Sequence, residues 1–375
     1  MKKMLLAFLP LSLAGFVLPD KLNKHNSATG TTNAEQYDGP YVLYKNNQVF
    51  AKYIMNDQGS KLIRSDSMAL PQKESLSVIV TTDEPGKTFT VQLKKKLQIE
   101  KSEYKKVNKQ MAISDIEGNF RAFRKLLQAN AVIDSDFNWT FGEGHLVLTG
   151  DFFDRGNQVT EVLWLIYSLE EKAKQAGGYV HFILGNHEIM NMNGDLRYVQ
   201  PKYKENAALL GERYEDLYGE NSELGRWLRT KNIIEKVGDM LYTHGGVSGE
   251  INRMDISISN INELARPFYA DNSYQYENKK QEIIYGDSGP FWYRGYYQES
   301  TKASPEQIDS TISKFNIRHI ATGHTIVADT ISTWYGGKVI DTDVHHAAGR
   351  SEALLIEGGK FYRVNTIGEK FLMME

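Results

Sequence analysis

The 375-residue chain contains no cysteine, and this absence removes several kinds of chemistry at once. Disulfide bonds, thiol nucleophiles and thiolate-bound metals are excluded, so any metal would have to be bound by histidine, carboxylate or amide side chains. Net charge is also nearly absent, at −3 at pH 7. A chain so close to neutrality gives no reason to expect a nucleic-acid partner.

Long apolar runs are few, and the clearest one lies at the N-terminus. Lys2 and Lys3 precede the apolar stretch 4–18. A basic start followed by an apolar stretch of this length is typical of a signal peptide and is too short for a comfortable membrane span. We therefore expect residues 1–19 to be a signal peptide or an N-terminal anchor of a periplasmic or extracellular protein. Membrane contact is expected through this segment only.

The next part of the chain predicts a linker and then a small β-rich domain. Residues 20–36 are rich in Asn, Thr, Ser and Gly, as mobile linkers are. Within residues 37–105, four short strand-like runs alternate with turn residues. These runs cover residues 41–44, 49–55, 77–82 and 88–93. A basic run, Lys94 to Lys96, is interpreted as a solvated face or a linker, with a polyanion site as the alternative.

From about residue 108 the pattern changes to alternating strands and helices. Strands are predicted at 109–114, 145–149, 179–184, 233–237, 240–243 and 317–322, and helices at 119–130 and 159–176. Residues 195–232 predict a helical insert. Terminal strands are predicted at 338–341, 352–357 and 360–364. Polar residues follow the strands at their carboxyl ends, which is where open α/β sheets form their sites.

Five short polar motifs occur in order along this part of the chain. They are Asp115-Ile-Glu117-Gly118, Gly150-Asp151-Phe-Phe-Asp154-Arg155-Gly156, Gly185-Asn186-His187-Glu188, His244-Gly245-Gly246 and Gly323-His324-Thr325. A single motif such as Gly-His-Thr is weak, because a surface turn produces it equally well. All five in this order make a structural coincidence improbable.

The order and residues of these motifs resemble the calcineurin-like metallophosphoesterase superfamily. Gly-Asp-x-x-Asp-Arg-Gly and Gly-Asn-His-Glu are similar to its phosphoprotein-phosphatase branch, and the tracts 194–198 and 289–294 are similar to bacterial Shewanella-like protein phosphatases. The resemblance covers about residues 108–345. It implies a four-layer α/β/β/α catalytic domain over 108–375 that hydrolyses a phosphorylated peptide (phosphotyrosine or phosphoserine/threonine) or a small phosphoester.

The resemblance also implies a dinuclear metal site. One ion would be bound by Asp115, Glu117 and Asp151, and the other by Asp151, Asn186, His244 and His324. Two cations about 3.5–4 Å apart supply a nucleophile at neutral pH and neutralise the phosphoryl oxygens. Imidazole and carboxylate ligands suit Mn, Fe or Zn better than Ca.

Four further residues would complete the catalytic machinery. The resemblance implies that Arg155 and Arg294 grip the phosphoryl oxygens, for which the planar guanidinium fork is suited. His187 would protonate the leaving oxygen, and either Asp154 or Glu188 would orient it.

Glu117 is a departure from the family, which has histidine at this position. A carboxylate also binds divalent cations, so we expect Glu117 to be a ligand that shifts the preference of its site towards Mn or Mg. The alternative is that Glu117 contacts metal-bound water. Elsewhere, His345-His346 follow Asp341-Thr-Asp343 near the expected site, whereas His145 and His181 are interpreted as core residues. The insert tyrosines Tyr198, Tyr203, Tyr214 and Tyr218 are interpreted as packing residues.

Other functional classes compete with this hypothesis. A phosphodiesterase or nucleotide hydrolase of the same superfamily is the nearest alternative. The tract 286–290, Gly-Asp-Ser-Gly-Pro, resembles the nucleophile tract of trypsin-like serine proteases. The strand–helix alternation of residues 108–190 and the absence of cysteine argue against that class. A non-catalytic binding module, based on the aromatic cluster 291–297, would show no metal-dependent hydrolysis.

Overall fold

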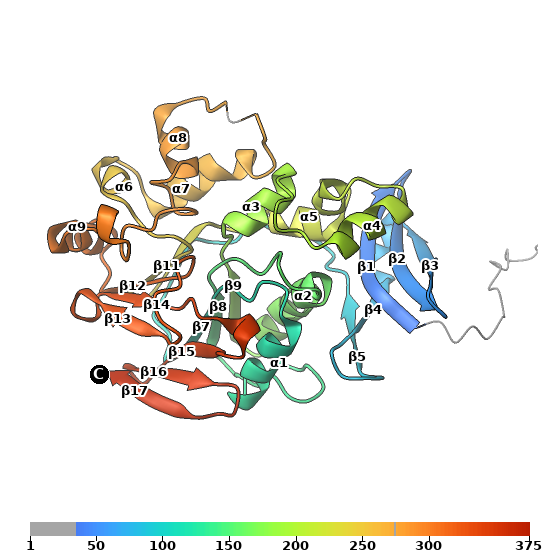
Figure 1. Ribbon diagram of the computed structural model, residues 1–375, viewed down its shortest axis with the longest axis horizontal. Coiled ribbons are helices and arrows are strands. Elements are labelled where there is room, and N and C mark those ends of the chain that lie inside the picture. Colours follow the sequence, from blue (N-terminus) through green and yellow to red (C-terminus); the bar gives the residue numbers. More distant parts are fainter. Residues whose placement is uncertain (1–34, 274) are drawn as a thin grey trace, which may run out of the picture.

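The structure is a computed structural model that describes residues 35–273 and 275–375 (Figure 1). The expected signal segment, residues 1–19, and residues 20–34 of the expected linker lie outside the described residues. Residues 35 and 36 were also expected in the linker, but they begin the first strand, β1 (Glu35–Lys45). Within the part of the chain that the structure describes, no helix is long and apolar enough to cross a membrane.

Two six-stranded sheets form the centre of the molecule. The first has the order β17-β16-β15-β7-β8-β9, and the second has the order β13-β14-β12-β11-β10-β6. The first comprises β7 (Lys109–Ile113), β8 (His145–Leu148), β9 (Tyr179–Phe182), β15 (Glu352–Glu357), β16 (Lys360–Asn365) and β17 (Lys370–Met374). The second comprises β6 (Glu103–Tyr104), β10 (Ile234–Val237), β11 (Met240–Thr243), β12 (His319–Thr322), β13 (Ser332–Trp334) and β14 (Val339–Asp341).

The central strands of each sheet run parallel, and apolar side chains fill the space between the sheets. Strands β7, β8 and β9 are parallel neighbours, as are β11, β12 and β14. Strands with apolar side chains on both faces are typical of parallel sheets covered on both sides. Ala112 and Val147 from one sheet meet Tyr242 and Ile340 from the other in a buried cluster.

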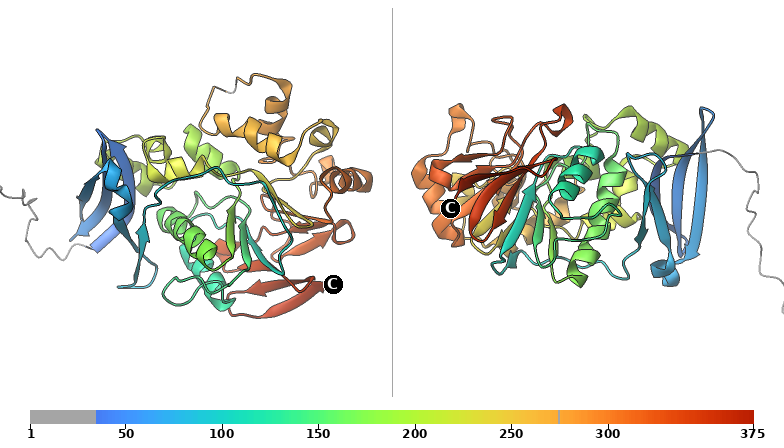
Figure 2. Two further views of the ribbon diagram at one scale, coloured as in Figure 1. Left: turned by 180° about the vertical axis from the view of Figure 1, so that it is seen from behind. Right: turned by 90° about the horizontal axis from the view of Figure 1, so that it is seen from below.

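Helices cover the outer faces and complete the four layers that the family resemblance implies (Figures 1 and 2). The long helices are α1 (Phe120–Ala129), α2 (Val159–Gln175), α3 (Asn186–Asn193), α4 (Pro201–Leu210), α7 (Ile258–Ala265) and α9 (Pro305–Phe315). The short ones are α5 (Glu223–Leu228), α6 (Gly249–Arg253) and α8 (Lys279–Tyr285). Helix α2 packs on β9, and α7 packs on β10. The predicted α/β/β/α class is therefore confirmed.

Short 3-10 helices link several of these elements. They are η1 (Leu70–Ser75), η2 (Glu215–Tyr218), η3 (Arg266–Phe268), η4 (Glu299–Thr301), η5 (Tyr335–Gly337) and η6 (His346–Ala348). The helical insert at residues 195–232 contains α4, η2 and α5. These elements lie between the N-terminal strands and the central sheets (Figure 1).

The N-terminal region contains a three-stranded antiparallel sheet, β1-β2-β3, and the hairpin β4-β5. Its remaining strands are β2 (Gln48–Asp57), β3 (Ser60–Ala69), β4 (Ser77–Thr81) and β5 (Thr88–Gln92). Strand β3 was not predicted, because its residues are almost all exposed or polar and show no apolar alternation. The region packs on the helices: the Trp164 indole of α2 donates to the Pro40 carbonyl at 2.8 Å.

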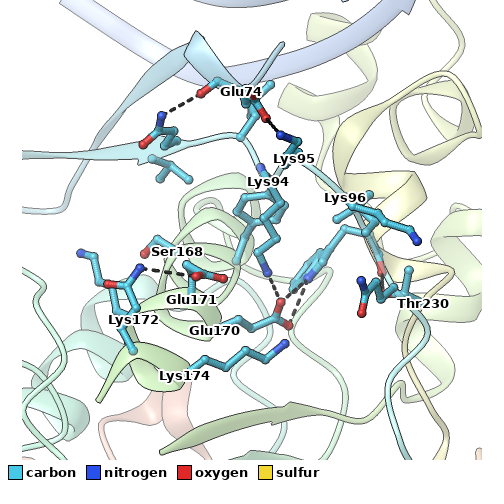
Figure 3. Close-up of a pocket in the computed structure, with 18 of the residues that line it drawn as sticks. Glu74, Lys94, Lys95, Lys96, Ser168, Glu170, Glu171, Lys172, Lys174 and Thr230 are labelled. Atoms are coloured by element: carbon cyan, nitrogen blue, oxygen red, sulfur yellow. Dashed lines mark hydrogen bonds and ion pairs between the residues drawn. The ribbon is translucent and has the colours of Figure 1, made fainter. Parts of the chain in front are cut away.

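The basic run at residues 94–96 borders a cavity of about 1040 Å³ between the N-terminal region and α2 (Figure 3). Lys94 points inwards to the buried carboxylate of Glu170, which also contacts the Lys231 ammonium at 2.6 Å. Burial alone would raise the pKa of Glu170, but Lys231 and Lys94 lower it to about 2. Lys95 pairs with Glu74 at 3.6 Å and is 85% exposed. The run is therefore solvated only in part.

Candidate metal centre and active site

The five polar motifs follow β7, β8, β9, β11 and β12, and therefore lie at the carboxyl edges of the two sheets. Their loops turn unusually sharply. Asp115, Glu117, Asp151, Asp154, Arg155 and His324 all have positive φ between 49° and 69°. For residues with a Cβ this left-handed conformation costs roughly 1–2 kcal/mol each. Strain of this kind is typical of sites where function fixes the direction of a side chain.

Asp151, His244 and His324 form a buried cluster in which one ligand atom from each lies within 4.8 Å of the others. The His244 Nε2 atom lies 3.0 Å from Asp151 Oδ2 and 3.0 Å from Asn186 Oδ1. His244 Nδ1 lies 2.8 Å from the Thr149 carbonyl, which can only accept a hydrogen bond. Nδ1 therefore carries a proton and orients the ring, and a metal ion would take the place of the proton on Nε2. The four residues predicted for the second ion thus converge.

The residues predicted for the first ion carry carboxylates that repel one another. Burial and then Asp151 raise the pKa of Asp115 to about 6, against a lowering effect of His244. Burial and Asp115 raise the pKa of Glu117 to about 8, although Arg155 lowers it. A cation bound beside these carboxylates would offset their repulsion and favour their ionised forms. The donor set of carboxylate, amide and imidazole therefore fits divalent metal ions.

Asp151 is the residue that the two predicted ions would share. Its Oδ1 atom accepts the His187 backbone N–H at 2.9 Å, which fixes the carboxylate at the start of α3. Burial alone would raise the pKa of Asp151, but His244 and His187 hold it below its ordinary value. This side chain is accordingly ionised and available to bridge two cations.

His187 and Asp154 form a hydrogen-bonded pair beside the cluster of Asp151, His244 and His324. His187 Nδ1 donates to Asp154 Oδ2 at 2.7 Å, while His187 Nε2 faces Asp151 Oδ2 at 3.7 Å. Of the two candidates for orienting His187, the structure therefore favours Asp154. Glu188 instead accepts three backbone N–H groups, from Gly185, Asp151 and Phe152, at 2.7–2.9 Å. Its carboxylate holds together two of the loops that carry predicted metal ligands.

The two arginines approach the centre from different sides. The Arg155 guanidinium pairs with Glu117 at 2.8 Å, and its side chain is 52% exposed. Arg294 donates to the His324 carbonyl and, at 3.1 Å, to the Thr325 hydroxyl. Both guanidinium groups thus lie beside predicted metal ligands, where they could bind phosphoryl oxygens.

Two glycines are required by close approach to the carboxylates. A Cβ atom on Gly185 would lie 2.3 Å from Asp151 Oδ1, and one on Gly323 would lie 2.3 Å from Asp115 Oδ2. Any other residue at either position would displace a predicted metal ligand.

One residue at the site, Asp343, was not singled out in the sequence. Asp343 is buried, and repulsion from Asp115 adds to burial in raising its pKa. The adjacent histidines diverge: His346 is buried, whereas His345 is exposed and pairs with Asp329 at 2.7 Å. The only sequence signal for Asp343 as a residue of the site was its position just after a predicted strand.

Tyr198 differs from the packing role predicted for the insert tyrosines. Tyr203, Tyr214 and Tyr218 are buried as predicted, but Tyr198 is 43% exposed. Its ring centroid lies 5.1 Å from that of His187 and 5.5 Å from the Arg155 guanidinium carbon. An exposed aromatic ring therefore stands at the rim of the site. The protease-like tract 286–290 forms the turn that leads from α8 to Arg294.

Comparisons with known proteins agree with this geometry. The model of the calcineurin-like phosphoesterase family matches residues 109–328. An uncharacterised protein of Schizosaccharomyces pombe is 30% identical, covering 65% of this chain and 75% of its own length. Shewanella-like protein phosphatase 2 of Arabidopsis thaliana is 25% identical over 68% of this chain and 76% of its own. The crystal structure of a cold-active protein-tyrosine phosphatase from a psychrophilic Shewanella is 35% identical, covers 90% of this chain and 99% of its own, and superposes with a TM-score of 0.81.

Proposed function

This chain belongs to the calcineurin-like phosphoesterase family, and we propose that it is a protein phosphatase that acts on phosphotyrosine. Membership of the family makes it a metal-dependent phosphoester hydrolase. The choice of substrate is supported by the cold-active tyrosine phosphatase that it resembles over nine-tenths of its length. The site itself supplies a second and independent support, the exposed ring of Tyr198.

The metal ions would be held by the residues that converge at the sheet edges. Asp151, Asn186, His244 and His324 suit Mn, Fe or Zn, and the carboxylates of Asp115 and Glu117 favour Mn or Mg at the other position. When bound, such ions supply an activated water and balance the charge of the phosphoryl group.

The side chains around the ions bind the substrate and move one proton. The guanidinium groups of Arg155 and Arg294 bind the phosphoryl oxygens and set the direction of the phosphorus–oxygen bond that breaks. His187 donates its Nε2 proton to the leaving oxygen, while Asp154 holds the Nδ1 proton.

The observation that carries the choice of phosphotyrosine is the position of Tyr198 beside His187. Since His187 must face the leaving oxygen, a ring that adjoins His187 adjoins the leaving group as well. An aromatic leaving group can stack on Tyr198, whereas the side chain of phosphoserine is too short and lacks a ring.

The test is an activity panel on protein that has been freed of metal by chelation. Mn, Fe, Zn and Mg are titrated in against a phosphotyrosine peptide, the matched phosphoserine peptide and a bis-aryl phosphodiester. We expect activity to return with metal and to be greatest on the phosphotyrosine peptide, with phosphate inhibiting as a product. Metal-independent activity would contradict the function, and preferred cleavage of the diester would indicate a phosphodiesterase.

A matched pair of variants then tests Tyr198. Tyr198→Leu should lower kcat/KM for the phosphotyrosine peptide by about three- to tenfold, the value of one aromatic contact, and leave the phosphoserine peptide unchanged. Tyr198→Phe keeps the ring and should retain the preference. An equal loss on both peptides in Tyr198→Leu would show that the ring does not select the substrate.

We also propose that the protein is exported, on the basis of the basic and apolar segment at residues 2–18. Cell fractionation tests this, because an intact protein recovered from the cytoplasm would contradict it.

A further inference from the structure

A series of buried hydrogen bonds extends from His187 away from the metal cluster. Asp154 Oδ2, which accepts from His187, also accepts from Asn191 Nδ2 at 2.9 Å. Asn191 Nδ2 donates to the His187 carbonyl at 2.8 Å, and Asn191 Oδ1 accepts from the Tyr214 hydroxyl at 2.6 Å. All four side chains are buried, with Asn191 completely inaccessible. None of the five sequence motifs contains Asn191 or Tyr214.

We propose that Asn191 and Tyr214 are positioning residues for the general acid, and this proposal rests on the role given to His187 above. Asn191 fixes the Asp154 carboxylate, and Tyr214 fixes the Asn191 amide. Together they keep His187 Nε2 directed at the leaving oxygen of the substrate.

The need for this support follows from how Asp154 is bound. Among the described residues, Asp154 Oδ1 is buried and has no hydrogen-bond partner, so Oδ2 alone holds the carboxylate. Without Asn191, only the bond to His187 itself would define the orientation of Asp154. The carboxylate could then rotate and take the imidazole with it, and a small misplacement of a catalytic group is costly.

Tyr214 also explains why the amide of Asn191 has one orientation. The hydroxyl donates to Oδ1, which leaves the Nδ2 donors facing the Asp154 carboxylate. If the amide were reversed, its oxygen would face the carboxylate and be repelled. The hydroxyl of Tyr214 therefore acts on His187 through two intermediate side chains.

The two residues come from different elements. Asn191 lies one turn after His187 on α3, so the two side chains share a helix face. Tyr214 immediately precedes η2 in the helical insert, and its ring packs edge-on to Tyr218 at 5.6 Å. Tyr218 in turn packs on Phe153 at 4.7 Å. The helical insert therefore contacts the predicted active site through Tyr214 and Tyr218.

The experiment compares Tyr214→Phe with Tyr242→Phe. Tyr242 is a buried tyrosine whose hydroxyl donates to the Gln110 amide oxygen at 2.9 Å, so the control removes the same kind of bond elsewhere. The kcat of each metal-saturated protein is measured on aryl monophosphates whose leaving phenols span a range of pKa. A good leaving group needs little protonation, whereas a poor one depends on the general acid.

We expect Tyr214→Phe to lower kcat for phenyl phosphate about tenfold more than for para-nitrophenyl phosphate, a fraction of the roughly 10²–10⁴-fold that general acid catalysis contributes. KM and metal content should be unchanged. Tyr242→Phe should lower kcat, if at all, by the same factor for every substrate. Equal losses across the series in Tyr214→Phe, or no loss, would overturn the proposal.

A readout independent of turnover separates this proposal from the proposed function. The imidazole N–H proton that bonds to Asp154 is observed by NMR and assigned by its absence in His187→Gln. We expect this signal to be sharp in the wild-type protein and in Tyr242→Phe, and broadened by exchange in Tyr214→Phe and Asn191→Leu. If the wild-type protein gives the sharp signal but has no phosphatase activity, only the proposed function is refuted. If the signal is unchanged in both Tyr214→Phe and Asn191→Leu, the positioning role is refuted.

Discussion

At the scale of single residues, Asp151 is the side chain on which both predicted metal positions depend. Asp151→Asn keeps the size of the side chain and the Oδ1 acceptor for His187, and asparagine tolerates the φ of 60° at this position. The variant loses the charge that would bind two cations. Loss of a residue that only hydrogen-bonds to a metal ligand costs roughly 10- to 100-fold in activity. Loss of a ligand shared by two ions should lower turnover by more than this.

Metal content and the melting temperature are measured on the same Asp151→Asn protein. We expect less bound metal and a melting temperature close to that of the wild-type protein. Asp136→Asn, at a side chain that is 76% exposed, is the control and should alter neither value. Near-normal activity in Asp151→Asn would refute the bridging role.

Glu117 provides a second prediction at this scale. Glu117→His replaces a hard carboxylate with an imidazole, and histidine accepts the left-handed conformation of this residue more readily than most. The preference of the site should move from Mn or Mg towards Zn. Metal content after equilibration with an equimolar mixture measures this. Unchanged stoichiometry and preference would count against a ligand role for Glu117.

The sequence identified the residues of the site whose type and spacing are local, and it did not identify those that depend on long-range contact. Asp151, Asn186, His244 and His324 follow strands, and parallel strands bring their carboxyl ends to one edge. The structure accordingly places them together, while their roles stay predictions. Tyr214 reaches Asn191 across 23 residues of an irregular insert, and no periodicity encodes such a contact.

At the scale of secondary-structure elements, the turn after β12 is limited by the space beside Asp115. Gly323→Ala would place a Cβ atom 2.3 Å from Asp115 Oδ2, so the carboxylate must move. We expect metal affinity to fall by about 10- to 100-fold, with an overpacking cost of about 1–3 kcal/mol in stability. Calorimetric metal titration and urea unfolding measure the two effects. Gly249→Ala, whose nearest neighbour is the flexible Arg253 side chain at 3.3 Å, should show neither.

Helix α2 is held to the N-terminal region through the buried carboxylate of Glu170. Glu170→Gln leaves the ammonium groups of Lys231 and Lys94 without their charge partner, so the free energy of unfolding at pH 7 should fall by about 3 kcal/mol. Because the folded pKa of about 2 lies below the unfolded value of about 4.3, the contribution of Glu170 is present above pH 4.3 and lost as the pH falls towards 2.

Urea unfolding at pH 7 and at about pH 3 measures this difference. The gap between the wild-type protein and Glu170→Gln should be smaller at the lower pH. Glu171→Gln, at an exposed neighbouring position, is the matched control and should leave stability unchanged at both. A gap that is equal at the two pH values would show that the charge of Glu170 contributes nothing.

Strand β3 marks the limit of prediction for elements. Most of the other strands have apolar residues that alternate or run together, which the sequence shows directly. Strands β6, β13 and β17, which also lie at sheet edges, were likewise not predicted. β3 pairs with β2 along its whole length, but it is the edge of its sheet and faces water with residues such as Arg64 and Asp66. Backbone pairing alone maintains such a strand, so its side chains carry little signal.

At the scale of the whole molecule, the N-terminal strands share one core with the catalytic sheets. Asp83 forms a bidentate ion pair with Arg124 of α1, with both distances at 2.7 Å. Tyr44 of β1 bonds to Glu223 of α5, and Glu223 accepts from Tyr167 of α2 at 2.6 Å. Removing the region would expose buried apolar surface and leave several of these charges without partners.

We therefore expect the described chain to unfold in a single cooperative transition. Calorimetry of the intact protein should give one peak, and a chain that begins at residue 106 should fail to accumulate as soluble protein. Two separated transitions, or a folded and active truncated protein, would show that the N-terminal region is an independent unit.

The four layers followed from the family resemblance more than from the pattern of residues. Alternating strands and helices indicate an α/β fold, but the order of the strands within the two sheets depends on which distant segments pair. β6 pairs with β10 and β15 pairs with β7, across more than a hundred residues in each case, and both pairings escape local patterns.

The left-handed backbone at six polar residues has a consequence for laboratory evolution. A library selected for heat resistance alone would be enriched in glycine or asparagine at positions such as Glu117 and Arg155, because those residues adopt a left-handed φ more readily than glutamate or arginine does. Such clones would gain thermal tolerance while losing chemical competence. Selection for thermal stability alone would therefore replace residues of the predicted active site, unless catalytic activity is also selected in every round.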